Sequence, residues 1–300
     1  MQPVGPLKFL FVINPVSGGK SKHSWKDSIT QYFDSKPHAI HFFELSGKND
    51  ADSLSEKITS LKPHRVIAVG GDGTVNLVAR KLLGTDIIMG VLPAGSANGF
   101  AKELGLPHAQ EASLALVENG IIKKLDVLHI NNECISLHLA DLGLNAQLIK
   151  YFEESNWRGK LGYAKVLFKT LWRTQRVRVL IETDTQTISR RAYMVVLANS
   201  RTYGTGAVIN PIGKLNDGKF EVIVIRKLAF SELLKMIFQH KTYDPRKVEI
   251  LRTSTVSIKT SRKIYFQADG EYMGKKELVT AQIIPGKLNL LTSGESDGLK

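Results

Sequence analysis

A glycine-rich turn at residues 69–74, Val-Gly-Gly-Asp-Gly-Thr, is the first segment whose residue types can do chemistry. Glycine lets a backbone turn sharply and approach a phosphate without interference from a Cβ atom. A helical pattern begins at Thr74, and a helix N-terminus offers N–H groups and a positive dipole to an anion. The turn therefore predicts a phosphate site, and a tight strand-to-helix turn that binds nothing is the alternative.

A second turn of the same kind, Pro-Ala-Gly-Ser-Ala-Asn-Gly at residues 93–99, follows the next apolar run and again precedes a helical pattern. The ends of adjacent parallel strands lie at one edge of a sheet. Two such ends that present glycine and hydroxyl residues predict a single anion-binding crevice.

A third turn, residues 14–21, reads Asn-Pro-Val-Ser-Gly-Gly-Lys-Ser. Its tail is similar to a P-loop, but the opening glycine that the P-loop pattern requires five residues before Gly19 is Asn14. We therefore reject a P-loop. Lys20 either faces a phosphate or is an ordinary solvated loop lysine.

An acidic pair, Asp269 and Glu271, flanks Gly270 in the second half of the chain. Taken alone, Asp-Gly between two strands indicates a hairpin turn. Beside a nucleotide, one carboxylate can accept the proton of an alcohol and another can hold Mg²⁺ near the phosphates. In an extended segment both side chains would point the same way, and we leave their separate roles open.

The elements that must position these residues alternate in the first third of the chain. Continuous apolar runs predict buried strands, and helical patterns between them stop at Gly84 and Gly105. The predicted strands are Lys8–Ile13, Ala39–Leu45, Arg65–Val69 and Ile87–Leu92; the clearest helices are Thr74–Leu83 and Ala97–Leu104. Strand-helix units in this order predict a mainly parallel, doubly wound sheet.

From Asp126 the pattern changes to short strands separated by polar turns, which predicts a mainly antiparallel β-sandwich. Its predicted strands are Val127–Ile130, Cys134–Leu139, Val177–Thr183, Ala192–Ala198, Lys219–Arg226, Val248–Ile258, Lys263–Gln267 and Leu278–Ile284, with helices at Gly162–Trp172 and Ser231–His240. We therefore expect an α/β domain at residues 1–125, a β-rich domain at 126–285, and a return of residues 286–300 to the first.

Composition narrows the class of protein. The 300 residues carry a formal charge of +13, which attracts nucleotides, anionic lipid headgroups or nucleic acid. One cysteine and no signal peptide indicate the cytoplasm, and no apolar stretch is long enough to span a bilayer. The eight histidines show no metal-ligand spacing, and the scattered cations match no nucleic-acid-binding motif.

The three glycine turns, in this order and spacing, resemble those of the diacylglycerol kinase catalytic domain superfamily, which includes bacterial lipid kinases and the sphingosine and ceramide kinases. The resemblance extends over nearly the whole chain. It implies an ATP-dependent kinase that phosphorylates a lipid hydroxyl, with Asp269 or Glu271 as the base and the lipid entering between the domains. The residues it assigns to the nucleotide are Asn14, Pro15, Ser17, Gly18, Ser46, Gly70, Gly71, Asp72, Gly73, Thr74, Asn76, Gly95, Ser96 and Asn98.

The resemblance also implies a structural Mg²⁺ held by Asp217 and the main-chain oxygens of Lys214 and Lys219; an ordinary Asn-Asp-Gly turn that binds no metal is the alternative. One departure concerns the second glycine turn. Bacterial diacylglycerol kinases usually have Asn-Asp there, whereas this chain has Asn98-Gly99, which is closer to the sphingosine and ceramide kinases. The chain therefore lacks the carboxylate that a magnesium network at this position would use.

Lipid substrates imply transient peripheral contact with the inner membrane surface. A helical stripe with Leu161 to Trp172 on one face and Lys165, Lys169 and Arg173 on the other suits an anionic membrane, although a surface helix packed on a sheet has the same pattern. No protein partner is predicted. The alternatives to a lipid kinase are an NAD kinase, which resembles the same fold, and a catalytically silent nucleotide or lipid sensor.

Overall fold

The structure of the protein, a computed structural model, describes residues 5–17, 23–144, 146, 175–202, 208–227 and 243–293. The predicted helices Gly162–Trp172 and Ser231–His240 lie outside these ranges, as do Gly18, Gly19 and Lys20. The chain divides into two compact units, Met1–Leu125 with Pro285–Lys300, and Asp126–Ile284. We call them the α/β unit and the β unit.

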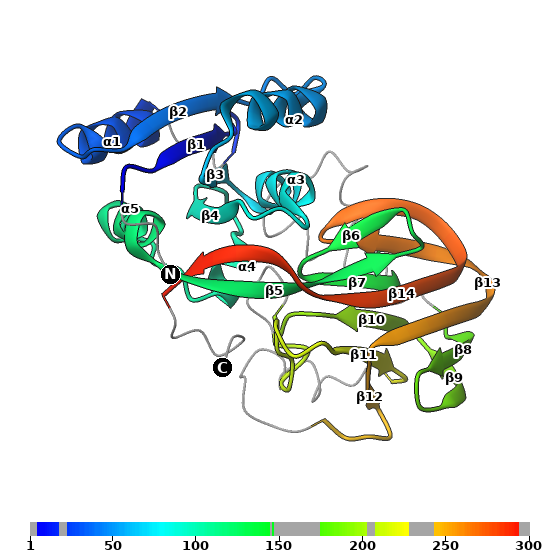
Figure 1. Cartoon of the computed structure of the whole chain (residues 1–300). Helices are drawn as coiled ribbons and strands as arrows, with labels where there is room; N and C mark the ends of the chain where they lie inside the picture. The colour runs from blue at the N-terminus through cyan, green and yellow to red at the C-terminus, as the bar shows by residue number, and fades with distance from the viewer. Residues whose placement is uncertain are drawn as a thin grey trace. The chain divides into compact units, whose positions relative to one another are not determined.

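The α/β unit contains a parallel sheet with the strand order β2-β1-β3-β4-β14 (Figure 1). The strands are β1 (Lys8–Ile13), β2 (Ala39–Glu44), β3 (Arg65–Gly70), β4 (Ile88–Pro93) and the final residues of β14 (Glu271–Thr292). All six residues of β3 are buried, because both faces of the sheet are covered. This explains why β3 is an apolar run without alternation, whereas the residues of β2, at the edge of the sheet, are half-buried or exposed.

Among the described residues, five helices accompany this sheet: α1 (His23–Phe33), α2 (Asp50–Leu61), α3 (Asp72–Leu82), α4 (Gly99–Glu103) and α5 (Gln110–Asn119). Phe9 and Phe11 of β1 pack in one cluster with Phe33 of α1 and Val117 of α5. Leu10 alternates with them and is also fully buried, while α3 contacts β1, β3, β4 and α2. Helices therefore cover both faces, which confirms the predicted doubly wound sheet.

Glycines end the helices on either side of the second turn. Gly84 follows α3 with a φ of +71°, and Gly105 follows α4 with a φ of +62°. Both values are left-handed, which confirms the two predicted stops. Helix α3 begins two residues earlier than predicted, because the Gly71 carbonyl accepts hydrogen bonds from the N–H groups of Thr74 and Val75.

The β unit is mainly antiparallel and confirms the predicted β-sandwich. One run of strands has the order β12-β11-β10-β7-β13-β14, while β8 pairs with β13 and β9, and β5 pairs with β14 and β6. Their bounds are β5 (Ile121–Ile130), β6 (Cys134–Ser136), β7 (Leu139–Gly143), β8 (Val177–Thr183), β9 (Thr187–Ala192), β10 (Met194–Ala198), β11 (Phe220–Ile225), β12 (Val248–Thr253) and β13 (Thr255–Ala268).

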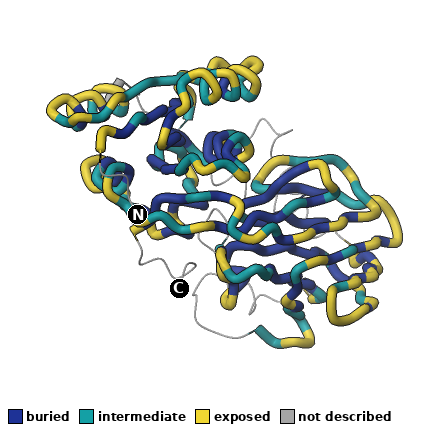
Figure 2. The backbone as a smooth tube through the Cα atoms, in the orientation of Figure 1, coloured by how far each residue is buried: buried dark blue, intermediate teal, exposed yellow. Residues whose placement is uncertain are grey.

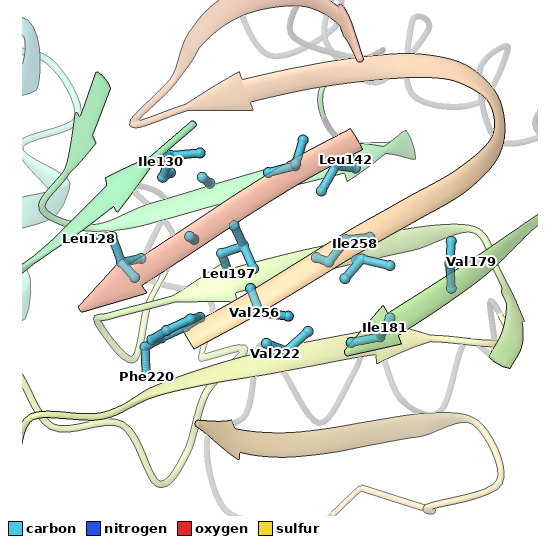
Figure 3. Packing of buried hydrophobic residues seen from close by; sticks show 14 of the residues in the cluster. Leu128, Ile130, Leu142, Val179, Ile181, Leu197, Phe220, Val222, Val256 and Ile258 are labelled. Carbon is cyan, nitrogen blue, oxygen red and sulfur yellow. The ribbon is translucent and has the colours of Figure 1, made fainter. Parts of the chain in front are cut away.

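Alternate side chains of these strands meet in an apolar core (Figure 3). Ile181 of β8, Phe220 and Val222 of β11, and Ile258 of β13 are fully buried in it. Burying one such side chain stabilises the fold by roughly 1.5–3 kcal/mol. Figure 2 shows the buried strands in dark blue and many exposed positions on the β8–β9 hairpin.

The prediction of one strand over Val248–Ile258 is wrong, because the segment breaks at Ser254 into β12 and β13. The Asp184 carboxylate accepts hydrogen bonds from the Ser254 N–H at 3.0 Å, the Ser254 hydroxyl at 2.8 Å and the Thr253 hydroxyl at 2.8 Å. These contacts bind the bend to the β8–β9 turn. An uninterrupted β-forming sequence gives no sign of a partner 70 residues away.

Asp184 is expected to make the protein sensitive to acid. The Ser254 N–H, followed by the Ser254 and Thr253 hydroxyls, holds the pKa of Asp184 well below its usual range. A lowered pKa in the folded state contributes stability that is complete above the unfolded value of about 3.9 and is lost as the pH falls below it. Asp184→Asn should therefore lower the melting temperature near neutral pH but progressively less below about pH 4.

Thermal melts of both proteins across this pH range test the expectation, with Asp86→Asn at an exposed position as the matched control. A difference in melting temperature between wild type and Asp184→Asn that stays constant with pH would contradict it.

Within the described residues, no helix has the length and apolarity needed to cross a membrane.

Candidate functional site

The three predicted turns follow strands β1, β3 and β4 at one edge of the parallel sheet. The Asn14 N–H donates to the Val69 carbonyl at 3.1 Å, and the Ala94 N–H donates to the Gly70 carbonyl at 3.0 Å. Gly70 lies opposite Pro93 in the β3–β4 register. The structure thus brings the beginnings of all three turns together within the α/β unit.

The turns that follow β3 and β4 bring two glycines, Gly71 and Gly95, into direct contact. A Cβ atom on Gly95 would lie 2.4 Å from the Gly71 Cα and 3.0 Å from the Gly71 nitrogen. A Cβ atom on Gly71 would lie 3.3 Å from the Gly95 Cα. Backbone cannot move aside as a flexible side chain can, so the close approach of these turns requires glycine at position 95.

Two predicted nucleotide-binding side chains hold the turns in shape. The Asp72 carboxylate accepts hydrogen bonds from the N–H groups of Gly99 and Phe100, each at 3.0 Å, and so caps α4 from the neighbouring turn. The Asn98 side chain bonds both the N–H and the carbonyl of Gly95, at 2.8 and 2.9 Å. The sequence prediction missed both positioning roles, because they depend on side-chain contacts that the fold creates, within one turn for Asn98 and between two turns for Asp72.

The predicted phosphate-binding residues at this edge differ in how far they are exposed. Ser96 is exposed on the second turn, and Gly73 is exposed in the first turn of α3. Thr74 is only 3% exposed, and its hydroxyl has no hydrogen-bond partner within the described part of the chain. Asn76, one turn into the same helix, is buried as well. The exposed groups suit a phosphate better than the two buried ones do.

The other predicted residues of the unit lie at neighbouring strand ends. The Asn14 side chain accepts a hydrogen bond from the Val16 N–H at 3.0 Å, and its carbonyl accepts the Ser17 hydroxyl at 3.2 Å. Ser46 follows β2, and its N–H donates to Asp50 of α2 at 2.8 Å. Pro15 is exposed between these groups. The Ser46 hydroxyl donates to the Lys48 carbonyl at 2.9 Å, so the side chains of Asn14 and Ser46 both stabilise their own turns.

This edge fits a nucleotide phosphate. It offers glycine turns that approach each other closely, exposed positions at Gly73 and Ser96, and the positive N-terminal end of the eleven-residue helix α3. Asp72 places a negative charge in the first turn of that helix, but both of its oxygens are bound by backbone N–H groups.

The acidic pair of the β unit is separated by a hairpin turn. Asp269 and Gly270 have φ angles of +48° and +88°, and Ala268 pairs with Glu271 across the turn. This confirms the hairpin interpretation. The segment is a turn and is not extended, so the reason for expecting both carboxylates to point the same way does not apply.

Asp269 is fully engaged by the segment that joins β6 to β7. Its carboxylate accepts four hydrogen bonds, from the Ser136 hydroxyl at 2.7 Å and from the N–H groups of Leu137, His138 and Leu139 at 2.8, 3.0 and 3.1 Å. Glu271 is exposed at the start of β14. The Asp269 carboxylate is therefore half-buried and held by four donors, while the Glu271 side chain lies at the surface.

A buried polar chain, which the sequence prediction missed, supports the same turn. The Gly270 N–H donates to the Gln267 side chain at 2.8 Å, and Gln267 in turn donates to Asp141. Asp141 also accepts the Ala146 N–H at 2.9 Å. Gln267 and Asp141 are 1% and 0% exposed, so each polar group must be paired, and the chain holds the turn in place.

The predicted metal ligand Asp217 has both carboxylate oxygens occupied. One accepts from Arg252 at 2.5 Å and the other from the Lys219 N–H at 3.1 Å. Arg252 also lies 3.6 Å from the buried Glu221. No group of three acidic, histidine or cysteine side chains that could hold a metal occurs in the ranges described. In this arrangement the Arg252 guanidinium supplies a positive charge to the one carboxylate of the predicted ligand set.

This arrangement predicts a stability that does not depend on magnesium. The melting temperature of the wild type should be the same in Mg²⁺ and in a chelator, because Arg252 already neutralises Asp217. Arg252→Gln should cost up to about 1 kcal/mol, since the arginine is half exposed, and should make the melting temperature rise with added Mg²⁺.

Arg190→Gln, which breaks an arginine–glutamate pair elsewhere in the β unit, is the matched control and should gain no response to Mg²⁺. A wild type that melts at a lower temperature in chelator would show that a metal does bind at the turn.

Comparisons with known proteins cover both units. A family model described as diacylglycerol kinase catalytic domain matches residues 8–130, and one described as YegS C-terminal NAD kinase beta sandwich-like domain matches residues 139–292. A protein named diacylglycerol kinase from Bacillus subtilis is 24% identical, over 88% of this chain and 89% of that protein. A protein named "Probable lipid kinase YegS" from Salmonella arizonae is 27% identical, over 83% of this chain and 85% of that protein.

The fold is also similar to a crystal structure described as a diacylglycerol kinase from Bacillus anthracis. It superposes with a TM-score of 0.78 at 19% identity, covering 96% of this chain and 98% of that one.

Proposed function

We propose that this protein transfers the γ-phosphate of ATP to the hydroxyl of a lipid such as diacylglycerol or a sphingoid base. The chain belongs to the diacylglycerol kinase catalytic domain superfamily of lipid kinases, which supports this proposal. The observation that carries the proposal is the contact between Gly71 and Gly95, which presents two glycine turns at one sheet edge. Such an edge suits a chain of phosphates.

In this proposal the α/β unit binds ATP. The phosphates lie against the exposed backbone at Gly73 and the hydroxyl of Ser96, with the N-terminus of α3 directed at them. Asp72 and Asn98 act as positioning residues, because their side chains bond the turns. Mg²⁺ is the ion that ATP carries on its own phosphates, where it would neutralise their charge.

Glu271 is the proposed general base, and Asp269 is a positioning residue. An exposed carboxylate can accept the proton of the lipid hydroxyl as its oxygen attacks the γ-phosphorus and ADP leaves. Asp269 is less suited to this step, because four donors already occupy its oxygens. Its bonds fix the turn from which Glu271 projects.

Lipid hydroxyls are found at membranes, so the proposal includes transient contact with an anionic membrane on its cytoplasmic side. The net charge of +13 supports such contact. No step of the proposal requires a nucleic acid or a protein partner.

The second candidate function is an NAD kinase, favoured by the description of the family model that matches residues 139–292. Labelled ATP offered with diacylglycerol, monoacylglycerol, sphingosine, ceramide, phosphatidylglycerol or NAD separates the two functions. Label in at least one lipid and none in NAD is expected. Label in NAD alone would replace the lipid kinase with an NAD kinase, and ATP binding without transfer to any acceptor would indicate a silent sensor.

A further inference from the structure

We propose that one outer face of the β unit is a docking surface for anionic membrane lipids. The face consists of Arg178, Leu180, Arg191, Lys259 and Leu278, and we call it the basic-apolar face. It is separate from the residues proposed for ATP and for catalysis. It rests on the proposed function only in that a lipid kinase must reach a membrane.

The strand register places two leucines on either side of one lysine. Lys259 of β13 lies opposite Leu180 of β8 and opposite Leu278 of β14. Residues directly opposite each other project from the same face of a sheet. Leu180 is 37% exposed and Leu278 is 53% exposed, and they are two of the five exposed large apolar side chains among the described residues. A leucine–lysine–leucine row thus crosses three strands.

These side chains point away from the core. Figure 3 shows Val179, Ile181 and Ile258 turned inward, and these residues alternate with Leu180 and Lys259 along β8 and β13. Successive side chains of a strand point to opposite faces, so the leucine–lysine row is on the outer surface.

Two arginines extend the face. Arg178 is two positions from Leu180 on β8 and lies opposite Arg191 of β9, and both are exposed. Like charges directly opposite each other on a sheet are destabilising unless an anion lies near them. Within the described part of the chain, no ion pair joins either arginine or Lys259 to an acidic side chain. The three cations therefore remain available to an anionic ligand.

On the side of the leucine–lysine–leucine row away from Arg178, the surface is polar and contains a cavity. Glu182, two positions beyond Leu180, lies opposite Ser257, which in turn lies opposite Thr280. These three residues help to line a cavity of about 290 Å³. The hydroxyl groups in this cavity can donate hydrogen bonds to a lipid phosphate, and the Glu182 carboxylate can accept one from a headgroup hydroxyl.

Exposed leucines between cations match the interface of an anionic bilayer, where apolar side chains enter the acyl boundary and cations meet phosphates. Nucleic acid would use the cations but would gain nothing from the leucines, because its backbone is recognised by charge. A membrane is therefore the occupant that accounts for both kinds of side chain.

Sedimentation with vesicles tests the face in the full-length protein. Vesicles of phosphatidylcholine alone are compared with equal parts of phosphatidylcholine and phosphatidylglycerol, without diacylglycerol. Wild type should bind the anionic vesicles far better than the neutral ones. A variant with Arg178→Gln, Arg191→Gln and Lys259→Gln should bind them about two orders of magnitude more weakly, since each cation near the surface contributes about 1 kcal/mol.

The matched control removes the same net charge elsewhere, with Lys227→Gln, Arg246→Gln and Lys287→Gln, and should keep most of the binding. Leu180→Thr with Leu278→Thr should weaken binding even at high salt, where charge is screened, whereas Ile212→Thr at another exposed site should not. Thermal melts of each variant check that the protein is folded. Equal losses in the two triple variants, or a wild type that ignores vesicles and binds an RNA duplex, would overturn the proposal.

Kinase assays in detergent micelles separate this proposal from the proposed function. The triple variant of the basic-apolar face should phosphorylate micellar lipid at the wild-type rate. If neither the wild type nor any variant transfers phosphate but vesicle binding still depends on the basic-apolar face, the kinase assignment fails and the docking surface stands. If transfer occurs and vesicle binding is indifferent to the face, the docking surface fails alone.

Discussion

Glu271→Gln is expected to reduce kcat for lipid phosphorylation by about 10²- to 10⁴-fold, the range for loss of a general base. Glutamine has nearly the same size but cannot accept the hydroxyl proton. Because Glu271 is exposed at the start of β14, the melting temperature of the variant protein and its Kd for ATP should stay close to those of wild type. Steady-state kinetics with labelled ATP, together with a thermal melt, make the comparison.

Asp269→Asn is the informative comparison, because it changes the partner in the same hairpin turn. An asparagine amide cannot accept all four hydrogen bonds that the carboxylate receives, so stability should fall by about 1–3 kcal/mol. Of these two variants, only Asp269→Asn should combine reduced activity with a lower melting temperature. Full activity in Glu271→Gln, or kinetic loss without destabilisation in Asp269→Asn, would reverse the two roles.

Gly95→Ala is expected to have the second large effect, on both ATP binding and stability. Its Cβ atom would lie 2.4 Å from the Gly71 Cα, a distance that only a shift of the backbone can relieve. Such overpacking typically costs about 1–3 kcal/mol, and separating the turns should also weaken ATP binding by at least about tenfold. Isothermal titration with ATP and a thermal melt measure the two effects.

Gly73→Ala controls for the effect on stability of adding a methyl group at this edge of the sheet. No atom lies within 4 Å of the added Cβ, and alanine is favoured in a helix, so the melting temperature should not fall. A Gly95→Ala protein that melts and binds ATP like wild type would contradict the close contact between the two turns.

Much of the α/β unit could be predicted because its signals are local. Four apolar runs mark the strands, of which β3 is buried throughout while the edge strand β2 is only half-buried or exposed, and Gly84 and Gly105 mark helix ends through their left-handed φ angles. The positions of the three turns at one sheet edge follow from the parallel topology. The hairpin at Asp269 was likewise readable from its Asp-Gly pair.

The roles of individual acidic residues could not be predicted, because they depend on contacts distant in sequence. Asp72 caps a helix 27 residues away, and Asp269 binds N–H groups about 130 residues away. The Asp217 turn resembles a metal site, yet Arg252 on another strand occupies the carboxylate. Asp184 breaks a predicted strand in the same way, through a side chain from another hairpin. Residue types show which chemistry is available, and only the fold shows which groups are already engaged.

The central claim is that this chain moves a phosphate from ATP to a lipid hydroxyl with Glu271 as the base. A single-turnover experiment with enzyme in excess of γ-labelled ATP, in micelles that contain diacylglycerol, tests it most directly. We predict that wild type transfers the label to extractable lipid and that Glu271→Gln binds the labelled ATP but leaves it intact. Label released as inorganic phosphate with none in lipid, or transfer at the wild-type rate by Glu271→Gln, would contradict the claim.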